Sequence, residues 1–220
     1  DNWGVTTQGR ENYLLRNDGG KFTDVTTAAG ISGRGEGLSM LWFDYDRDGW
    51  TDLYIANDMI SLDQLWRNRG DGTFVDVMGD AVPHTAWFSM GSDFGDVNND
   101  GAMDFFVADM SATNHFKQKT TMGVMGGKIL ARSQATRPPQ YMRNAFFLNT
   151  GTGRFLEGAF QSKIASSDWT WAVQFMDVDS DGWLDLLVTN GTVRALNDSD
   201  RSLTPEQLKV KHEWEYIKGH

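Results

Sequence analysis

The chain lacks several features that would point to common classes of enzyme or membrane protein. It contains no cysteine, so disulfide bonds and thiol chemistry are excluded, although this absence does not by itself fix a compartment. No apolar run approaches the roughly 18 residues that a membrane helix needs, so we expect a protein that does not span a membrane. Its four histidines are scattered, and no phosphate loop, Gly-x-Ser-x-Gly, His-Glu-x-x-His or dinucleotide-binding pattern occurs. We therefore expect no enzymatic activity from these residues.

Basic residues are also in short supply, and the formal net charge is −10 at pH 7. This charge argues against nucleic acid as a partner. Eleven of the 30 acidic residues, however, lie in three short loops. Much of the acidity therefore belongs to those loops and says little about other partners.

One nine-residue pattern, Asp-x-Asp/Asn-x-Asp-Gly-x-x-Asp, occurs at residues 44–52, 96–104 and 177–185. Side-chain oxygens at positions 1, 3, 5 and 9, together with the backbone carbonyl of position 7, can surround one hard cation, and the glycine at position 6 permits the sharp turn. Three copies with the same glycine register predict three Ca²⁺ sites. The predicted ligands are Asp44, Asp46, Asp48, Trp50, Asp52, Asp96, Asn98, Asp100, Ala102, Asp104, Asp177, Asp179, Asp181, Trp183 and Asp185.

These loops differ from an EF-hand, which carries a bidentate Glu at position 12 and a helix on each side. Position 12 is Ile55, Val107 or Val188, and each lies in a run of apolar residues typical of a short buried strand. The metal is therefore expected to join one strand to the next and to have a structural role.

A second element recurs between the loops, at residues 13–22, 65–74 and 146–155. It consists of a strand that ends in Asn, a glycine-containing turn and an aromatic residue that opens another strand, which is typical of a β-hairpin. One unit thus contains a strand, an acidic loop, a strand and a hairpin. Four strands in about 50 to 60 residues are the pattern of a β-propeller blade, so the predicted fold class is all-β.

These motifs resemble the FG-GAP/VCBS repeat family of calcium-loop β-propellers. More narrowly, the chain looks like the bacterial secreted proteins related to cartilage acidic protein, which often carry an associated ASPIC/UnbV domain. The residues that carry the resemblance are 22–26 with 29–31, 65–68 with 71–74, 137–144 and 168–171. Family rings of this kind have about seven blades. The resemblance implies a partial propeller of about three four-stranded blades over residues 1–200, with a self-contained small propeller as the alternative.

Two excursions interrupt the repeats. The first, an insertion over residues 110–141, contains Lys117, Lys119, Lys128, Arg132 and Arg137 but no acidic residue between 111 and 141. These cations either form a contact surface for an anionic glycan, an acidic partner or a neighbouring subunit, or pair with acidic residues of their own propeller. The second, over residues 201–220, is a helical insertion or C-terminal extension, with a helix predicted over 205–217. Both are expected on the face opposite the metal loops.

Four tryptophans have positions that can be interpreted. Trp169 and Trp171 alternate along the strand that enters the third loop, and such residues are usually core. Trp50 and Trp183 would bind metal through their backbone carbonyls alone, which leaves their rings free to lie on the surface.

The functional expectation follows from the loops and the resemblance. Calcium loops of modest affinity fill where calcium is millimolar, which favours an extracellular, cell-surface or periplasmic location. The leading hypothesis is a non-enzymatic, calcium-stabilised propeller for binding, adhesion or assembly, with a protein or glycan partner on the insertion-bearing face. The alternatives are a propeller enzyme that acts on polysaccharide with its active site in further blades, and a structural subunit of a surface filament.

Overall fold

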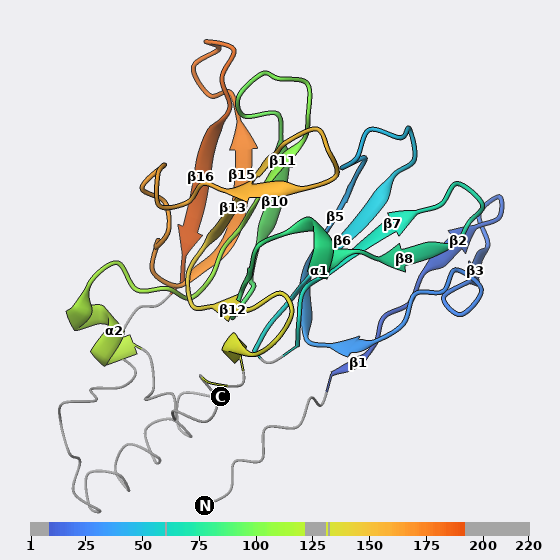
Figure 1. The fold of residues 1–220 in the computed structure, drawn as a ribbon, viewed down its shortest axis with the longest axis horizontal. Helices are drawn as coiled ribbons and strands as arrows, with labels where there is room; N and C mark the ends of the chain where they lie inside the picture. Colours follow the sequence, from blue (N-terminus) through green and yellow to red (C-terminus); the bar gives the residue numbers. More distant parts are fainter. Residues whose placement is uncertain (1–8, 60, 122–130, 132, 192–220) are drawn as a thin grey trace, which may run out of the picture.

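A computed structural model describes residues 9–59, 61–121, 131 and 133–191. Strands predominate among these residues, and the described helices are short: α1 (Met78–Ala81) and α2 (His115–Thr121). The sheets stand beside one another across the molecule (Figure 1). None of the helices in the described part is long and apolar enough to cross a bilayer.

Two sheets have four antiparallel strands each, and both follow the predicted unit. The first has the order β5 (Gly37–Phe43), β6 (Asp52–Asn57), β7 (Gln64–Asn68) and β8 (Phe74–Asp76). The second has the order β10 (Ser92–Gly95), β11 (Asp104–Val107), β13 (Ala145–Asn149) and β14 (Phe155–Glu157). In each sheet an acidic loop joins the first two strands and a hairpin joins the last two. The structure thus confirms the predicted strand, loop, strand and hairpin.

Two further strand pairs are halves of the same unit. The third acidic loop joins β15 (Thr170–Met176) to β16 (Asp185–Asn190), and the first hairpin is β2 (Leu15–Asn17) with β3 (Phe22–Asp24). They lie at opposite ends of the molecule, with both four-stranded sheets between them (Figure 1). Two pairs of two-residue strands complete the description: β1 (Arg10–Glu11) with β4 (Arg34–Gly35), and β9 (Thr85–Ala86) with β12 (Gln140–Tyr141).

The core consists of aromatic side chains trapped between neighbouring sheets. Between the first and second sheets, Phe43 stacks on Phe94 with ring centroids 5.2 Å apart, and Tyr54 lies 4.9 Å from Phe105. The strands β5, β10 and β15 each open their sheet, and β10 contacts both of the others. Sheets that pack in series through their faces, with their first strands adjacent, agree with a propeller-like fold. The described sheets do not close into a ring.

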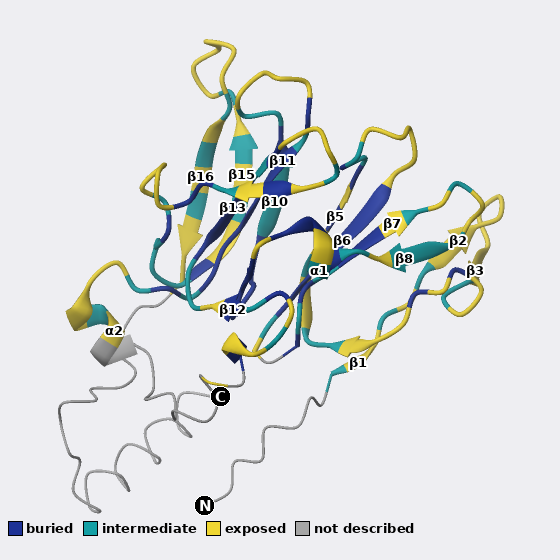
Figure 2. Cartoon of the chain, in the orientation of Figure 1, coloured by how far each residue is buried: buried dark blue, intermediate teal, exposed yellow. Residues whose placement is uncertain are grey.

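Burial falls from the middle of the molecule to its two ends (Figure 2). Every residue of β6 and β11 is buried, whereas β2, β3 and much of β16 are exposed. Trp169 is half-buried against a small cluster with Trp87 and Phe88. Trp171 is 52% exposed, so its prediction as a core residue was wrong. The side chains of β15 that reach the core are Val173 and Phe175 instead.

The insertion is tied to the body of the protein by ion pairs. The Lys117 ammonium contacts the Asp168 carboxylate, and Arg137 Nη2 lies 2.9 Å from Asp80 Oδ1. For these two cations the structure supports pairing within the chain. The predicted helix over 205–217, Lys128 and Arg132 lie outside the described residues, as does the side chain of Lys119.

Candidate metal centres

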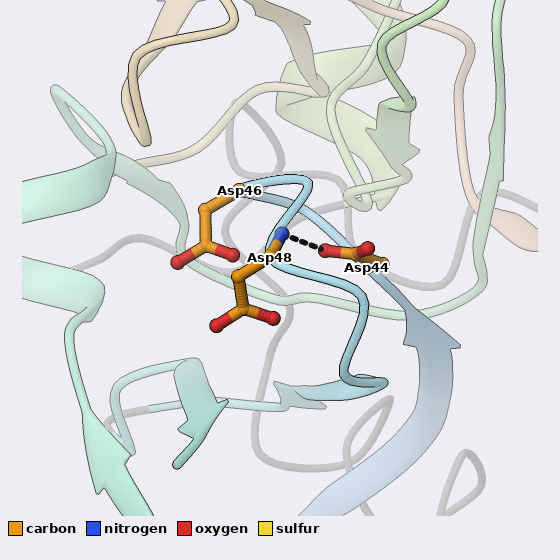
Figure 3. A group of neighbouring side chains, drawn as sticks. All are labelled: Asp44, Asp46 and Asp48. Atoms are coloured by element: carbon orange, nitrogen blue, oxygen red, sulfur yellow. Dashed lines mark hydrogen bonds between the residues drawn. The ribbon is translucent and has the colours of Figure 1, made fainter. Parts of the chain in front are cut away.

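The three acidic loops share one hydrogen-bonding frame. In the first, the position-1 carboxylate of Asp44 accepts hydrogen bonds from the backbone N–H groups of Asp48 (3.1 Å, dashed in Figure 3) and Gly49 (2.8 Å). Asp48 in turn accepts one from the backbone N–H of Trp50 at 2.8 Å. The same three bonds measure 3.0, 2.8 and 2.8 Å in the second loop and 3.1, 2.9 and 2.8 Å in the third. The repeated sequence therefore produces a repeated conformation.

Two backbone positions in each loop adopt positive φ. The glycine at position 6 has φ of 89°, 84° and 88° in the three loops. This agrees with the sharp turn predicted there, because glycine adopts positive φ readily. Position 4 is also left-handed, at Arg47 (63°), Asn99 (57°) and Ser180 (63°). Of these three residue types only Asn readily adopts this conformation, so the residues at position 4 did not predict it.

Carboxylate oxygens converge in the first and third loops. One oxygen from each of Asp44, Asp46 and Asp48 lies within 4.8 Å of the others, and Asp46 and Asp48 lie side by side in Figure 3. In the third loop the converging group is Asp177, Asp179 and Asp185, at positions 1, 3 and 9 where the first loop uses positions 1, 3 and 5. Ligand oxygens sit about 2.3–2.6 Å from Ca²⁺, so two that share an ion are at most about 5 Å apart. The observed separations fit a shared cation, and hard oxygen donors suit Ca²⁺.

In the second loop, Asn98 Nδ2 donates to Asp100 Oδ2 at 2.9 Å. An amide nitrogen does not ligate calcium, so a cation here would use Asn98 Oδ1. At position 7, Trp50 and Trp183 are 51% and 54% exposed, which confirms that their rings lie on the surface. Ala102, the third residue predicted to supply a carbonyl, is buried.

The carboxylate at position 9 also accepts backbone hydrogen bonds from outside its own turn, which the motif did not predict. Asp52 is fully buried and accepts hydrogen bonds from the backbone N–H groups of Tyr45 (3.0 Å) and Asn68 (2.8 Å). Asp104 makes the equivalent pair in the second loop, at 3.1 and 2.7 Å. Burial raises the pKa of both carboxyls to about 6, against the opposing effect of those hydrogen bonds. Asp185 is exposed, and among the residues that the structure describes it accepts a hydrogen bond only from a backbone N–H of its own loop, at 3.2 Å.

An asparagine at the end of the hairpin's first strand connects neighbouring loops. Asn149 Nδ2 donates to the carbonyls of Tyr45 (2.7 Å) in the first loop and Met103 (3.1 Å) in the second. Its Oδ1 accepts from the Gly151 N–H at 2.9 Å. Asn68 takes the same place in the first sheet, but its bonds stay within that sheet. The hairpin asparagines were visible in the sequence, whereas the bridge between sheets was not.

At the opposite ends of β6 and β11 lie two buried carboxyls outside the motif. Asp63 accepts hydrogen bonds from the hydroxyls of Tyr54 (2.7 Å) and Ser89 (2.8 Å) and from the Asn57 N–H (2.8 Å). The Ser89 bond joins the first sheet to the segment that leads into the second. Burial raises the pKa of Asp63 to about 7.

Asp109 is also fully buried, and burial raises its pKa to about 7. Its Oδ2 accepts hydrogen bonds from the backbone N–H groups of Trp87 (2.8 Å) and Phe88 (3.0 Å). Its Oδ1 is buried without a hydrogen-bond partner in the described residues. Counted from the start of each loop, Asp109 takes the place of Asn57, so the second repeat carries an acid where the first carries an amide.

The comparison with protein families agrees with this geometry. The FG-GAP-like repeat matches residues 4–55, 44–107 and 133–188. These segments cover well over half of the chain, and the protein belongs to the FG-GAP-like repeat family. No curated protein matches the chain. The repeats support a β-propeller-type fold suited to binding, while the narrower resemblance to ASPIC/UnbV-associated proteins stays a prediction.

Proposed function

We propose that this protein is a non-enzymatic, calcium-stabilised β-propeller module that serves binding, adhesion or assembly outside the cytoplasm. The observation that carries the proposal is the convergence of carboxylate oxygens within 4.8 Å in two loops that share one frame with a third. Carboxylates this close repel one another when bare, and a divalent cation replaces that repulsion with attraction.

Calcium in these loops would stabilise the strand pairs that they join. A site held at about 100 times its dissociation constant adds about 2.7 kcal/mol by mass action. Three such sites add about 8 kcal/mol, which is comparable with a whole domain's unfolding free energy of about 5–15 kcal/mol. Calcium removal is therefore expected to lower the melting temperature substantially and to expose residues 44–52, 96–104 and 177–185 to proteases.

The test compares thermal unfolding in saturating calcium with unfolding in excess chelator, for the wild type and for Asp48→Asn. Asparagine can still accept the hydrogen bond from Trp50 but removes one ligand charge, so the variant should lose about a third of the calcium-induced rise in melting temperature. Asp71→Asn is the matched control, because Asp71 also accepts a backbone hydrogen bond (2.9 Å, from Thr73) but stands in a turn where no other carboxylates of the described residues converge. Equal melting temperatures with and without calcium, after confirmed metal removal, would refute the stabilising role.

The partner we propose is a protein or a glycan on the insertion-bearing face. Lys117 and Arg137 both pair with acidic residues of the chain, which favours recognition by shape and hydrogen bonding over simple attraction of anions. Accordingly, we expect weak retention on a sulfated polysaccharide surface at low salt. Strong, salt-sensitive retention that Arg137→Glu abolishes would contradict this part of the proposal.

A further inference from the structure

The hairpin of the second sheet lies against the first acidic loop. Its turn, between β13 and β14, has positive φ at Gly151 and Gly153. A Cβ atom added to Gly153 would stand 3.9 Å from the Cβ of Asp46, so the turn packs beside a predicted ligand of the first loop. Asp46 Oδ1 is buried and has no hydrogen-bond partner among the described residues, which leaves it available to a cation. The first site is therefore bordered by two sheets.

Asn149, at the start of this hairpin turn, bonds to the first two loops beside their predicted ligands. Its Nδ2 donates to the carbonyl of Tyr45, which lies between the first two ligands of the first loop. The same Nδ2 donates to the carbonyl of Met103 in the second loop. Its backbone N–H donates at 2.7 Å to Asp104, the position-9 ligand of that loop. One buried residue thus connects the ligand sets of two loops.

Asn68 shows what is particular to Asn149. It has the same place in the first sheet, and its backbone N–H donates at 2.8 Å to Asp52, the position-9 ligand of the first loop. Its side chain donates to the Thr51 carbonyl of that loop and accepts from the Gly70 N–H. These bonds all stay within the first sheet. Asn68 therefore supports one loop, whereas Asn149 supports two.

The contact between the second and third loops is weaker. Asn99 Nδ2 donates to the carbonyl of Gly182 at 3.1 Å, and both residues are exposed. Water competes for hydrogen bonds at the surface, so an exposed bond holds two loops together less firmly than buried ones. Coupling between loops is therefore expected to be strongest between the first and the second.

We propose that Asn149 is a positioning residue that couples the first two calcium sites, so that calcium in either loop raises the affinity of the other. This inference rests on the proposed function and adds a regulation of the sites by each other. Bare carboxylates repel within a loop and loosen the bonds that the loop makes to Asn149. Once their charge is neutralised, Asn149 is fixed and holds the other loop close to its binding geometry, which lowers the cost of binding there. Coupling of this kind is reciprocal.

The test follows metal binding to the first loop while the second is disabled. Tb³⁺ takes hard oxygen ligands as Ca²⁺ does, and a nearby indole excites its luminescence. Trp50 stands at position 7 of the first loop, whereas the second has Ala102 there, and Trp183→Phe removes the matching indole of the third. In that background, Asp100→Asn disables the second loop, and Asp181→Asn, at the same position of the third loop, is the matched control. In both, asparagine can still accept the backbone bond that the aspartate accepts at 2.8 Å.

Calorimetry with Ca²⁺ should show that each of these two variants binds one ion fewer per chain. Asp100→Asn should weaken Tb³⁺ binding to the first loop at least about fivefold, and Asp181→Asn should change it less than about twofold. Repulsion between two bound cations would have the opposite sign, because an empty second loop would then favour binding to the first. Asn149→Ala should remove most of the effect of Asp100→Asn, and Asn68→Ala should preserve it.

The comparison of Asp100→Asn with Asp181→Asn needs no change at Asn149, so it decides the question even if Asn149→Ala does not fold. An unchanged or higher affinity of the first loop in Asp100→Asn, an equal loss in Asp181→Asn, or an effect that Asn149→Ala leaves intact would overturn the coupling alone. A wild-type chain that takes up no calcium would instead refute the proposed function, and the coupling with it.

Discussion

The side chain of Asn149 offers the sharpest test of how the acidic loops are coupled. Replacing it with alanine removes two donated hydrogen bonds, to the Tyr45 carbonyl at 2.7 Å and the Met103 carbonyl at 3.1 Å, and one accepted from Gly151 at 2.9 Å. Asn149 is only 4% exposed, so water replaces these partners poorly. Each lost bond costs about 1 kcal/mol, and a buried group left unpaired costs more, so Asn149→Ala should lower the unfolding free energy by about 3–4 kcal/mol.

Asn68 provides an internal control because it has the same place in the first sheet. It makes fewer contacts, a donated bond to the Thr51 carbonyl and an accepted bond from Gly70, both at 3.0 Å, and it is only half-buried. Asn68→Ala should therefore cost about 1–2 kcal/mol. For a chain of this size, the difference of about 2 kcal/mol corresponds to a gap of about 4–8 °C in melting temperature.

The assay is guanidinium unfolding followed by tryptophan fluorescence, in saturating calcium and again in chelator. Both variants should keep the wild-type m-value, because neither changes the surface exposed on unfolding. The difference between them should persist without calcium, since protein groups make the bonds. If Asn149→Ala were no more destabilising than Asn68→Ala, the hydrogen bonds between sheets would not couple the first two loops energetically.

Three further outcomes follow from burial and charge. The Asp109 carboxyl, with a pKa of about 7 when folded and an ordinary value of 3.8 when unfolded, should cost stability as the pH rises from about 4 to about 7. Asp109→Asn, which copies Asn57 of the first repeat, should therefore gain stability relative to the wild type with rising pH, by up to about 4 kcal/mol at pH 8; a pH-independent difference would contradict this. Phe105→Ala should cost about 3–5 kcal/mol in denaturant melts, because this fully buried ring lies within 5 Å of Tyr54. Arg137→Ala should change the unfolding free energy by less than about 1 kcal/mol, since its ion pair is exposed; a larger loss would show that the pair anchors the insertion.

The repeat unit could be predicted from the sequence because its signals are local. A glycine at position 6, carboxylates at alternate positions and apolar runs on either side specify a turn between two strands, and the asparagine and glycine pattern specifies the hairpin. Both were found where expected, with positive φ at Gly49, Gly101 and Gly182. The error at Trp171 has a different reason, because the pairing of β15 with β16 shifts register between Thr170 and Ala172, and this irregularity interrupts the alternation that brings Val173 and Phe175 to the core.

The chain of residues thus determined, by itself, the strand order, the acidic loops and the membership of a repeat family, because each depends on interactions among residues close in sequence. Only the tertiary structure decided which carboxylates converge, and that Asp52 and Asp104 also hold the following hairpin. It also decided that Asn149 joins the first two loops, although it lies 104 residues from Tyr45 in the sequence. Contacts of this kind depend on how one sheet packs against the next, and no short pattern of residues encodes that packing.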